Sequence, residues 1–341
     1  MAFNGFTRLM VAHMAVLSLV VLGSVAFAAG SRADDNGDFD VWLTGVREEG
    51  ISRGISPAIL DAALAGLAPI PRIIELDRGQ PESTITFAQY LDRVVTRKRI
   101  SKGRDRVATY GSLLGDVTKA YGVPGRFIVA LWGIETNFGQ YTGGFSVVAA
   151  LATLAHDGRR SAYFRKELLL ALEILDQGHI GVDSMKGSWA GAMGQSQFMP
   201  SSFLNYAVDY DGDGKRDIWT TKADVFGSAA NYLSGSGWRS GETWGREASL
   251  PAGFDPTLIS MDVAKPLAAW QALGVRRADG RNLPAADLMA SLVLPGGEGG
   301  PVFLVYENYR TILKWNRSHY FAMAVGHLAN AIGASSAKSA P

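Results

Sequence analysis

The stretch Phe127–Gly139 constrains the fold of this 341-residue chain more than any other feature. It is almost entirely apolar and carries one carboxylate, that of Glu135. Pro124 stands at a first helical position and Gly139 at a left-handed stop, which predicts a helix between them. Its apolar residues at helical spacing from the carboxylate are Leu131, Trp132 and Phe138. They are expected to crowd the carboxyl group.

Apolar crowding disfavours the ionised form of a carboxyl group, and so does the negative end of a helix dipole. Both conditions suit a proton donor that works near neutral pH. The alternative is a glutamate whose carboxylate simply reaches solvent at a helix end. The spacing of residues around Glu135 leaves both interpretations open.

A second distinctive segment is Gly187–Ser202, with the sequence GSWAGAMGQSQFMPSS. Its small residues predict a short helix that lets a polysaccharide approach the backbone. Ser188, Gln195 and Gln197 supply hydroxyl and amide groups that suit sugar hydroxyls. A tight helix-packing segment is the alternative, although these polar side chains would be costly if buried without ligands.

Composition indicates one large globular core with a subdomain, since 47% of the residues are hydrophobic and 19% are charged. Thirty-three basic and thirty-two acidic residues leave a net charge of +1, which gives no global field for nucleic acid. The chain has no cysteine, which excludes disulfides, thiolate metal sites and a thiol nucleophile.

The first residues have the pattern of a cleavable signal peptide spanning residues 1–28. Arg8 gives a positive start, Leu9 to Val25 form an apolar run, and Ala26-Phe27-Ala28 is a small-x-small cleavage site. A retained anchor is the competing interpretation, but the run is short and leads into a polar leader over residues 29–38. We expect export without a stable membrane anchor and, with no cysteine to acylate, no lipoprotein.

The motif Trp132–Gly139 (WGIETNFG) and the run Ala190–Pro200 (AGAMGQSQFMP) resemble the lytic murein transglycosylase B family. The resemblance extends over about residues 40–332. It implies a mainly α (α+β) fold with a lysozyme-like helical catalytic core over residues 39–239. Proline, glycine and short alternating runs suggest a small β subdomain over residues 240–300. Residues 301–333 are expected to return to the core, before a flexible tail over residues 334–341.

The resemblance also implies a set of site residues. Glu135 would be the sole catalytic carboxylate, and substrate binding would involve Tyr90, Arg159, Arg160, Ser188, Gln197, Tyr232 and Asn316. Trp315 and Phe321 stand where tyrosines are expected, and Tyr320 is a candidate to replace one of them. The sequence around Arg159 and Arg160 leaves open a purely structural role as salt-bridged residues at a helix start.

The segment 209–220 has the spacing of a calcium loop. Candidate ligands are Asp209, Asp211, Asp213, Lys215 through its carbonyl, and Asp217. Thr220 replaces the bidentate glutamate of a standard EF-hand at position twelve, and whether Thr220 or Asp224 completes the shell stays open. The sequence therefore predicts structural Ca²⁺, with an Asp-Gly turn cluster as the alternative. The resembled family carries an EF-hand-like loop here too.

A basic tract follows residue 90. Its cations are Arg93, Arg97, Lys98, Arg99, Lys102, Arg104 and Arg106. The sequence favours a solvated helix face, and the alternative is contact with acidic groups of peptidoglycan stems or of a membrane surface. Nucleic acid is not indicated, because the aromatic residues that interleave in such sites are missing.

The expected reaction uses one acid, because Asp157, Glu167 and Glu173 lie in ordinary helix contexts whereas common glycosidases need two carboxylates. By resemblance, Glu135 would protonate the β-1,4 oxygen between N-acetylmuramic acid and N-acetylglucosamine. It would then accept the proton of the C6 hydroxyl, which gives a 1,6-anhydromuramoyl end. The alternatives are a hydrolytic muramidase and a non-catalytic, calcium-stabilised glycan-binding protein.

We expect a monomer that acts in the periplasm on peptidoglycan glycan strands, with proteins of cell-wall synthesis or remodelling as further partners. No histidine shows metal-ligand spacing or a serine-elbow partner, so His156, His179, His319 and His327 are expected to be structural.

Overall fold

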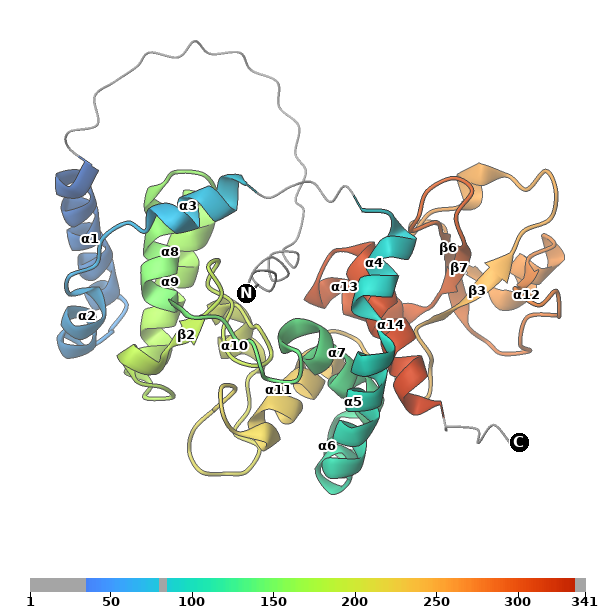
Figure 1. Ribbon diagram of the computed structural model, residues 1–341, viewed down its shortest axis with the longest axis horizontal. Coiled ribbons are helices and arrows are strands. Elements are labelled where there is room, and N and C mark those ends of the chain that lie inside the picture. The colour runs from blue at the N-terminus through green and yellow to red at the C-terminus, as the bar shows by residue number, and fades with distance from the viewer. Residues whose placement is uncertain (1–34, 80–84, 335–341) are drawn as a thin grey trace, which may run out of the picture. The chain divides into compact units, whose positions relative to one another are not determined.

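A computed structural model describes residues 35–79 and 85–334 of the chain. The expected signal peptide, most of the leader and residues 335–341 of the expected tail lie outside the described residues. The described residues form two compact units (Figure 1). One contains residues 35–79 and Glu135–Ala229, and the other contains residues 85–134 and 230–334. None of the helices in these ranges combines the length and the apolar character of a transmembrane span.

The first unit is mainly helical. Its elements are α1 (Asp35–Ser52), α2 (Pro57–Leu64), α3 (Pro71–Arg78), β1 (Phe145–Ser146), α8 (Val147–His156), α9 (Ser161–Asp176), η1 (Val182–Ser184), β2 (Lys186–Gly187) and α10 (Pro200–Tyr206). Helix α8 consists of apolar and small residues and is buried from Val147 to Ala155. Helices α2, α3 and α9 pack against it, as a helix that is apolar all round requires.

Helix α9 begins at Ser161 and is amphipathic. It buries Phe164, Leu168 and Leu172, which stand four residues apart and therefore lie on one face. The buried acid on this helix, Glu167, accepts a hydrogen bond from the amide of Ser201 at the start of α10, with 2.9 Å between Oε2 and N. Glu167 thus satisfies an amide that would otherwise be unpaired at a helix N-terminus.

The second unit combines helices with a sheet. Its elements are α4 (Phe87–Val94), α5 (Arg97–Thr109), α6 (Gly111–Tyr121), β3 (Gly245–Ser249), η2 (Pro256–Leu258), β4 (Lys265–Pro266), α12 (Leu267–Ala272), β5 (Arg276–Arg277), β6 (Met289–Val293), β7 (Val302–Val305), α13 (Glu307–Trp315) and α14 (His319–Gly333). Two further helices, α7 (Gly125–Thr136) and α11 (Lys222–Gly235), contribute residues to both units.

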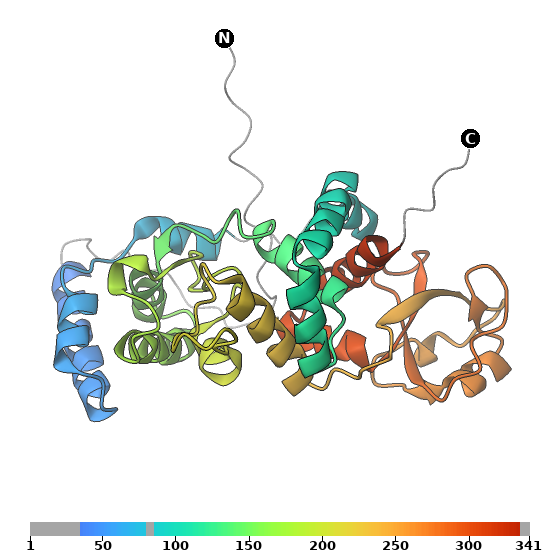
Figure 2. The same cartoon turned by 90° about the horizontal axis from the view of Figure 1, so that it is seen from below.

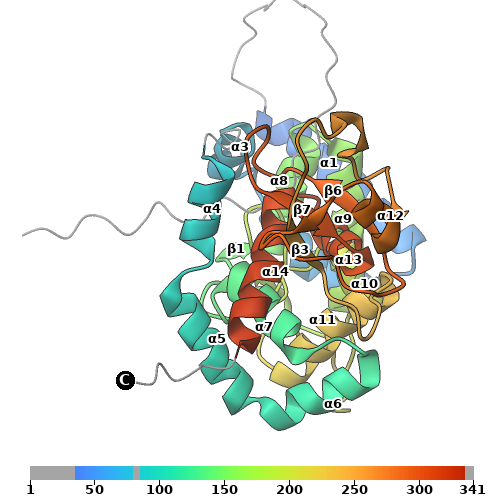
Figure 3. The same ribbon diagram turned by 90° about the vertical axis from the view of Figure 1, so that its right-hand side faces the viewer.

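Helix α14 forms the centre of the helical part of this unit (Figure 3). Ser318 caps its first turn by accepting the amide of Phe321, and α4, α5 and α13 pack against it. Arg104 of α5 donates to the carbonyl of Ala331 in the last turn of α14, with 2.8 Å between Nη2 and O. A guanidinium at this end stabilises the helix because it binds a carbonyl that the helix leaves unpaired.

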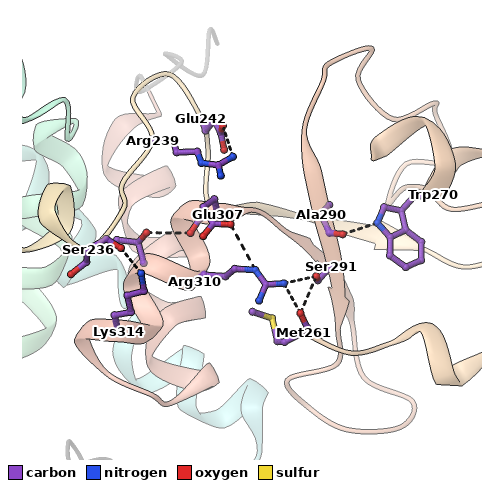
Figure 4. A network of polar contacts seen from close by, with 11 residues as sticks. Ser236, Arg239, Glu242, Met261, Trp270, Ala290, Ser291, Glu307, Arg310 and Lys314 are labelled. Carbon is purple, nitrogen blue, oxygen red and sulfur yellow. Dashed lines mark hydrogen bonds and ion pairs between the residues drawn. The ribbon is translucent and has the colours of Figure 1, made fainter. Parts of the chain in front are cut away.

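The sheet has the strand order β4-β6-β7-β3-β5, and all its pairings are antiparallel. Figure 2 shows the strands from below, in orange to red. Leu304 pairs with Leu292 on one side and with Arg246 on the other. Trp270 of α12 packs with Leu292 and Leu304 in the core of this subdomain and donates through Nε1 to the carbonyl of Ala290 at 2.8 Å (Figure 4). Strand β7, over Val302–Val305, belongs to this sheet because it pairs with both β6 and β3.

Helix α13 is tied to this sheet through Arg310. Its guanidinium donates to the carbonyl of Met261 and, at 2.7 Å, to the hydroxyl of Ser291 on β6 (Figure 4). Lys314, one turn further along α13, donates to the carbonyl of Ser236 at 2.7 Å. Two cationic side chains of α13 thus bind backbone carbonyls of two other segments of the second unit, at Met261 and Ser236.

Candidate active site

Glu135 is the penultimate residue of α7. The helix forms because its residues from Phe127 to Leu131 are all buried and apolar, so that packing stabilises it. Trp132 and Ile134 are also buried, whereas Glu135 is half-buried. A carboxyl group at this position belongs to a rigid helix and retains access to solvent.

Helix α7 ends at Thr136 and not at Gly139, where the sequence predicts the stop. The next three residues, Asn137, Phe138 and Gly139, all have left-handed backbones, with φ values of 51°, 63° and 77°. The hydroxyl of Thr136 accepts the amide of Gly139 at 3.0 Å, which satisfies a donor that a longer helix would have used. Phe138 therefore does not lie at helical spacing from Glu135, and its left-handed backbone is strained by about 1 kcal/mol or more.

The segment that follows α7 is joined to the loop Gly187–Ser202 by three contacts within the first unit. The hydroxyl of Thr136 donates to the carbonyl of Gln195 at 3.1 Å. The side-chain amide of Gln197 donates to the carbonyl of Thr142 at 3.2 Å. Strands β1 and β2 pair between them, with Phe145 opposite Gly187. These contacts bring the end of the helix that carries Glu135 against the loop with the predicted sugar-binding residues.

Gly143 makes the close approach between these two segments sterically feasible. Its φ is 94°, and a Cβ atom there would fall 2.0 Å from the carbonyl oxygen of Gly187. A Cβ atom at the neighbouring Gly144 would have no other atom within 4 Å. Only a residue without a side chain fits at position 143.

The loop itself is not the short helix that the sequence predicts over Gly187–Ser202. It consists of turns joined by bridges of Met193 to Gly187 and to Phe198, and helix starts only at Pro200. Gly191 and Gly194 have φ values of 87° and 63°, which a right-handed helix does not allow. Their freedom to adopt left-handed backbones turned the small-residue run into a folded loop.

The polar side chains of the loop are hydrogen-bonded to backbone groups, which corrects the argument that they would be unpaired without a ligand. The hydroxyl oxygen of Ser188 accepts the amides of Ala190 at 3.3 Å and Ala192 at 3.0 Å. Gln195 is buried and donates to the carbonyl of Trp219 at 2.6 Å. Gln197 donates to the carbonyls of Thr142 and, at 2.9 Å, Gly194.

Two polar groups of this loop keep hydrogen-bonding capacity. The hydroxyl proton of Ser188 and the side-chain oxygen of Gln197 have no partner among the residues that the structure describes. Ser188 and Gln197 are both half-buried, so neither side chain is sealed from solvent. A hydroxyl donor and an amide acceptor held by backbone contacts are suited to fix a polyhydroxylated ligand.

Arg159 and Arg160 both bind Asp77, a carboxylate of α3 with 1% exposure. Arg159 donates to Asp77 Oδ2 at 3.2 Å and to its carbonyl at 2.8 Å, and Arg160 donates to Oδ1 at 2.5 Å. Their observed contacts are those of salt-bridged residues at the start of α9, one of the two alternatives that the sequence leaves open. No local pattern pointed to Asp77, which lies far from the arginines along the chain.

The remaining predicted binding residues belong to the second unit. Tyr90 on α4 is buried, and its ring centroid lies 5.5 Å from that of Tyr320, the proposed replacement for an expected tyrosine. Tyr232 donates to the carbonyl of Lys314 at 2.7 Å, and its ring contacts Trp315 with centroids 4.8 Å apart. Phe321 is buried with 1% exposure, so it contributes to the core.

Asn316 lies between α13 and α14, next to Trp315. Its side-chain oxygen accepts the amide of Ser318 at 3.0 Å. The structure therefore places Asn316 near Tyr232, through Trp315, and places Tyr90 beside Tyr320.

The predicted calcium loop gathers three carboxylates. One oxygen from each of Asp209, Asp211 and Asp213 lies within 4.8 Å of the others. The backbone turns at Gly212 and Gly214, with φ values of 80° and 90°. Three hard oxygen donors at positions one, three and five fit a calcium ion.

Asp217 and Asp224 have other partners in this structure. Asp217 accepts the amides of Trp219 and Thr220, both at 2.9 Å, and hydroxyl groups of Thr220 and Thr221. Asp224 is fully buried and accepts the amides of Tyr210 and Asp217, both at 2.7 Å. Burial raises the pKa of Asp224, although these amides oppose the shift. Asp224 thus connects the two ends of the loop through their backbone amides. Neither Asp224 nor Thr220 belongs to the group of three carboxylates.

Comparison with known proteins decides the family. The sequence matches the family described as Transglycosylase SLT domain over residues 38–330. The chain belongs to this family. It is 35% identical over 253 residues to the membrane-bound lytic murein transglycosylase B of Escherichia coli (strain K12), which covers 72% of this chain and 67% of that relative. The resemblance to lytic murein transglycosylases is confirmed, and the chain is an enzyme, a lytic transglycosylase.

Solved structures resemble this lytic transglycosylase closely. SltB3 from Pseudomonas aeruginosa, in complex with NAG-anhNAM-pentapeptide, superposes with a TM-score of 0.84 and 45% identity, over 86% of this chain and 79% of that one. The Escherichia coli lytic transglycosylase Slt35 in complex with calcium superposes with a TM-score of 0.74 and 29% identity, over 87% and 93% of the two chains. The predicted mainly helical, lysozyme-like fold with a small sheet is confirmed.

Three residues that the sequence did not indicate connect parts of the candidate site. Thr136 connects the end of α7 to Gln195, and Asp77 binds Arg159 and Arg160. Gly143, which has no side chain, leaves room for the backbone of Gly187. Thr136 lies within the motif that carries Glu135, so its position pointed to a role at the helix end. Asp77 had no such signal, because its burial and its pairing depend on contacts distant in sequence.

Proposed function

We propose that this lytic transglycosylase cleaves the β-1,4 bond between N-acetylmuramic acid and N-acetylglucosamine in peptidoglycan and leaves a 1,6-anhydromuramoyl end. The observation that carries the proposal is the set of contacts that connect the end of α7, and the segment after it, to the loop of Ser188 and Gln197. It attaches the helix that carries the half-buried Glu135 to a loop with unused donor and acceptor groups for a sugar. SltB3, 45% identical to this chain, is in complex with a fragment that contains the anhydro sugar.

A one-acid mechanism is supported by the partners of three other acids in the first unit. Asp157 pairs with Arg78 at 2.6 Å, Glu167 accepts the amide of Ser201, and Glu173 accepts the side-chain amide of Gln177 at 3.0 Å. Each of these carboxylates stabilises a local structure. A second acid in the manner of common glycosidases is therefore not proposed.

In the proposed reaction Glu135 first acts as general acid. It gives its proton to the glycosidic oxygen as that bond to the anomeric carbon of N-acetylmuramic acid breaks, and the acetamido group of this sugar stabilises the cationic centre. The carboxylate of Glu135 then removes the proton of the C6 hydroxyl. The C6 oxygen bonds to the anomeric carbon, so the proton returns to Glu135 and no water is consumed.

In the first unit, Ser188 and Gln197 are proposed to contact the sugar, and Arg159 and Arg160 are proposed to face acidic groups of the substrate. In the second unit, Tyr90, Tyr232 and Asn316 are proposed to bind substrate. The proposal for the arginine pair requires a guanidinium to bind substrate while Asp77 holds its orientation.

Calcium is proposed as a structural ion bound by Asp209, Asp211 and Asp213, with the carbonyl of Lys215 and with Asp217 as further ligands. The three grouped carboxylates and the calcium complex of Slt35 support this assignment. The place of action is proposed to be the periplasm, after removal of residues 1–28, with the enzyme as a monomer.

Mass spectrometry of muropeptides released from purified sacculi tests the function. The expected products carry 1,6-anhydromuramoyl ends. Reducing N-acetylmuramic acid ends would instead show a hydrolytic muramidase, because water would have replaced the C6 hydroxyl. Binding to sacculi without any release would show a glycan-binding protein. A Glu135→Gln preparation is the control for contaminating enzymes.

A further inference from the structure

Tyr141 and Tyr163 are the exposed aromatic residues of the described ranges, and their surroundings differ. Tyr141 is 54% exposed and Tyr163 is 44% exposed. The ring of Tyr163 packs against that of Phe164, with centroids 5.2 Å apart. The ring of Tyr141 has no ring contact, and its hydroxyl has no hydrogen bond, within the described part of the chain. Tyr141 therefore presents a free aromatic ring to solvent.

The backbone around Tyr141 is attached to two parts of the candidate site in the first unit. The amide of Tyr141 donates to the carbonyl of Thr136, the residue after Glu135, at 3.0 Å. The carbonyl of the next residue, Thr142, accepts the side-chain amide of Gln197 at 3.2 Å. The segment that carries the free ring is thus bonded both to the end of the acid helix and to the loop proposed to contact the sugar.

Further contacts hold the turn between Glu135 and Tyr141 in one conformation. The hydroxyl of Thr136 accepts the amide of Gly139 at 3.0 Å. The side-chain amide of Asn137 donates to the side-chain oxygen of Gln140 at 2.6 Å. A ring on a backbone that is already ordered loses little conformational entropy when a ligand binds, so its contact with the ligand contributes more to affinity.

A free aromatic ring matches the apolar face of a sugar. The substituents of a β-1,4-linked glucosamine-type ring are equatorial, so its axial C–H groups form an apolar face. These C–H groups carry a partial positive charge, and the face of an aromatic ring is negative, so the two attract when they stack. The glycan strand of the proposed substrate consists of such sugars.

We propose that Tyr141 stacks against the C–H face of one sugar of the glycan strand and so helps to hold the strand beside Glu135. The inference rests on the proposed function and adds a binding residue to the same site. Stacking involves the aromatic ring and the sugar ring alone. It therefore requires neither the hydroxyl of Tyr141 nor the peptide stems of the strand.

The test measures equilibrium dissociation constants for soluble glycan strands from which an amidase has removed the stems. All proteins carry Glu135→Gln, so that binding is measured without cleavage. Tyr141→Ala removes the ring, Tyr141→Leu keeps an apolar side chain without the ring, and Tyr141→Phe keeps the ring without the hydroxyl. The matched control is Tyr163→Ala, at the other exposed tyrosine of the first unit.

We expect Tyr141→Ala and Tyr141→Leu to bind the strands about fivefold to tenfold more weakly, the effect of one lost aromatic contact. Tyr141→Phe and the control should match the parent. Unchanged binding of Tyr141→Ala would overturn the proposal, as would an equal loss in Tyr163→Ala. A loss in Tyr141→Phe as large as that in Tyr141→Ala would assign the contact to the hydroxyl and contradict stacking. Full affinity of Tyr141→Leu would contradict it too, since any apolar side chain would then suffice.

Fluorine NMR of the Glu135→Gln protein labelled with 3-fluorotyrosine keeps the test decisive if the Tyr141→Ala protein does not fold. The resonance of Tyr141 is the one that Tyr141→Phe lacks. Stem-free strands should shift this resonance and leave that of Tyr163 in place, and an unshifted Tyr141 resonance at saturating strand would contradict the proposal. Failure of the active enzyme to produce anhydro ends would refute the proposed function alone, because stacking is measured in a protein that does not cleave.

Discussion

The hydroxyl of Thr136 lies 3.1 Å from the backbone carbonyl of Gln195 and donates a hydrogen bond to it. This bond joins the residue after Glu135 to the loop of Ser188 and Gln197. The same hydroxyl accepts the amide of Gly139, so one side chain both ends helix α7 and attaches it to the loop. The position of the proposed acid relative to the loop therefore depends on a small number of polar contacts.

Glu135→Gln should abolish cleavage of peptidoglycan and leave the fold and glycan binding intact. The amide keeps the shape of the side chain but cannot donate the required proton, and loss of an acid catalyst costs at least ~10² in rate. Turnover on purified sacculi is the measurement. Glu173→Gln, at another half-buried helical acid, is the matched control and should keep full activity. Near-normal turnover of Glu135→Gln would exclude Glu135 as the acid.

Gln195→Ala and Gln197→Ala should separate stability from activity. Gln195 is 4% exposed and binds Trp219, so its loss should destabilise the protein by about 1–3 kcal/mol. Gln197 has an accessible side-chain oxygen, and its loss should reduce activity per folded molecule more than stability. Denaturant unfolding and turnover of both variants provide the comparison. Equal activity of folded Gln197→Ala and the parent would remove Gln197 from the proposed sugar site.

Gly143→Ala should be strongly destabilising, whereas Gly144→Ala should be nearly neutral. The added Cβ at position 143 would collide with the carbonyl of Gly187 and would occupy a left-handed backbone. We expect a loss above about 2 kcal/mol for Gly143→Ala and a change within about 0.5 kcal/mol for Gly144→Ala. Urea unfolding measures both. Similar stabilities of the two variants would show that the close approach of the loops is not required.

Calcium should raise the melting temperature without being required for chemistry. An ion that binds only the folded state stabilises it by about 2.7 kcal/mol at a hundredfold excess over its dissociation constant. Calorimetry with calcium, magnesium and chelator should show the shift, and Asp211→Asn with Asp213→Asn should abolish it. Asp183→Asn, at an exposed acid outside the loop, is the control. Identical melting temperatures in all three solutions would argue against the ion, and lost activity in folded, chelated enzyme would show a catalytic role.

The stability of the second unit should fall as the pH decreases below about 6.5, the ordinary pKa of histidine. Burial lowers the pKa of His327, whose Nε2 has no hydrogen-bond partner among the described residues and whose ring contacts Trp244 and Phe303. The unfolded chain then binds the proton more readily than the folded one, so stability is full above the unfolded pKa and is lost as the pH falls through the lowered folded pKa. Partial burial also lowers the pKa of His319, which should add to the effect.

Melting temperatures between pH 8 and pH 5 measure this dependence. His327→Gln cannot take up a proton in this range, so its melting temperature should decline less steeply with acid than that of the parent. Identical slopes for the two proteins would show that His327 does not contribute. A steeper slope for His327→Gln would reverse the assigned sign.

The sequence by itself predicted the helix that carries Glu135, because the signals of this helix are local. Pro124 and the apolar run after it predicted where α7 begins. The motif around Glu135 and the spacing of Asp209, Asp211 and Asp213 are also local patterns, which can be recognised in the sequence without knowledge of the fold. The structure confirmed that the three carboxylates come together.

Tertiary structure alone decided how the site is assembled. Left-handed backbones at Gly191 and Gly194 converted an expected helix into a loop, and Thr136 ended α7 before Gly139. Asp77 forms ion pairs with Arg159 and Arg160, which lie far away in the sequence. Asp224 accepts hydrogen bonds from two backbone amides of the predicted calcium loop. A buried polar group must satisfy its hydrogen bonds with whichever groups the packed chain brings near, and no local pattern specifies those partners.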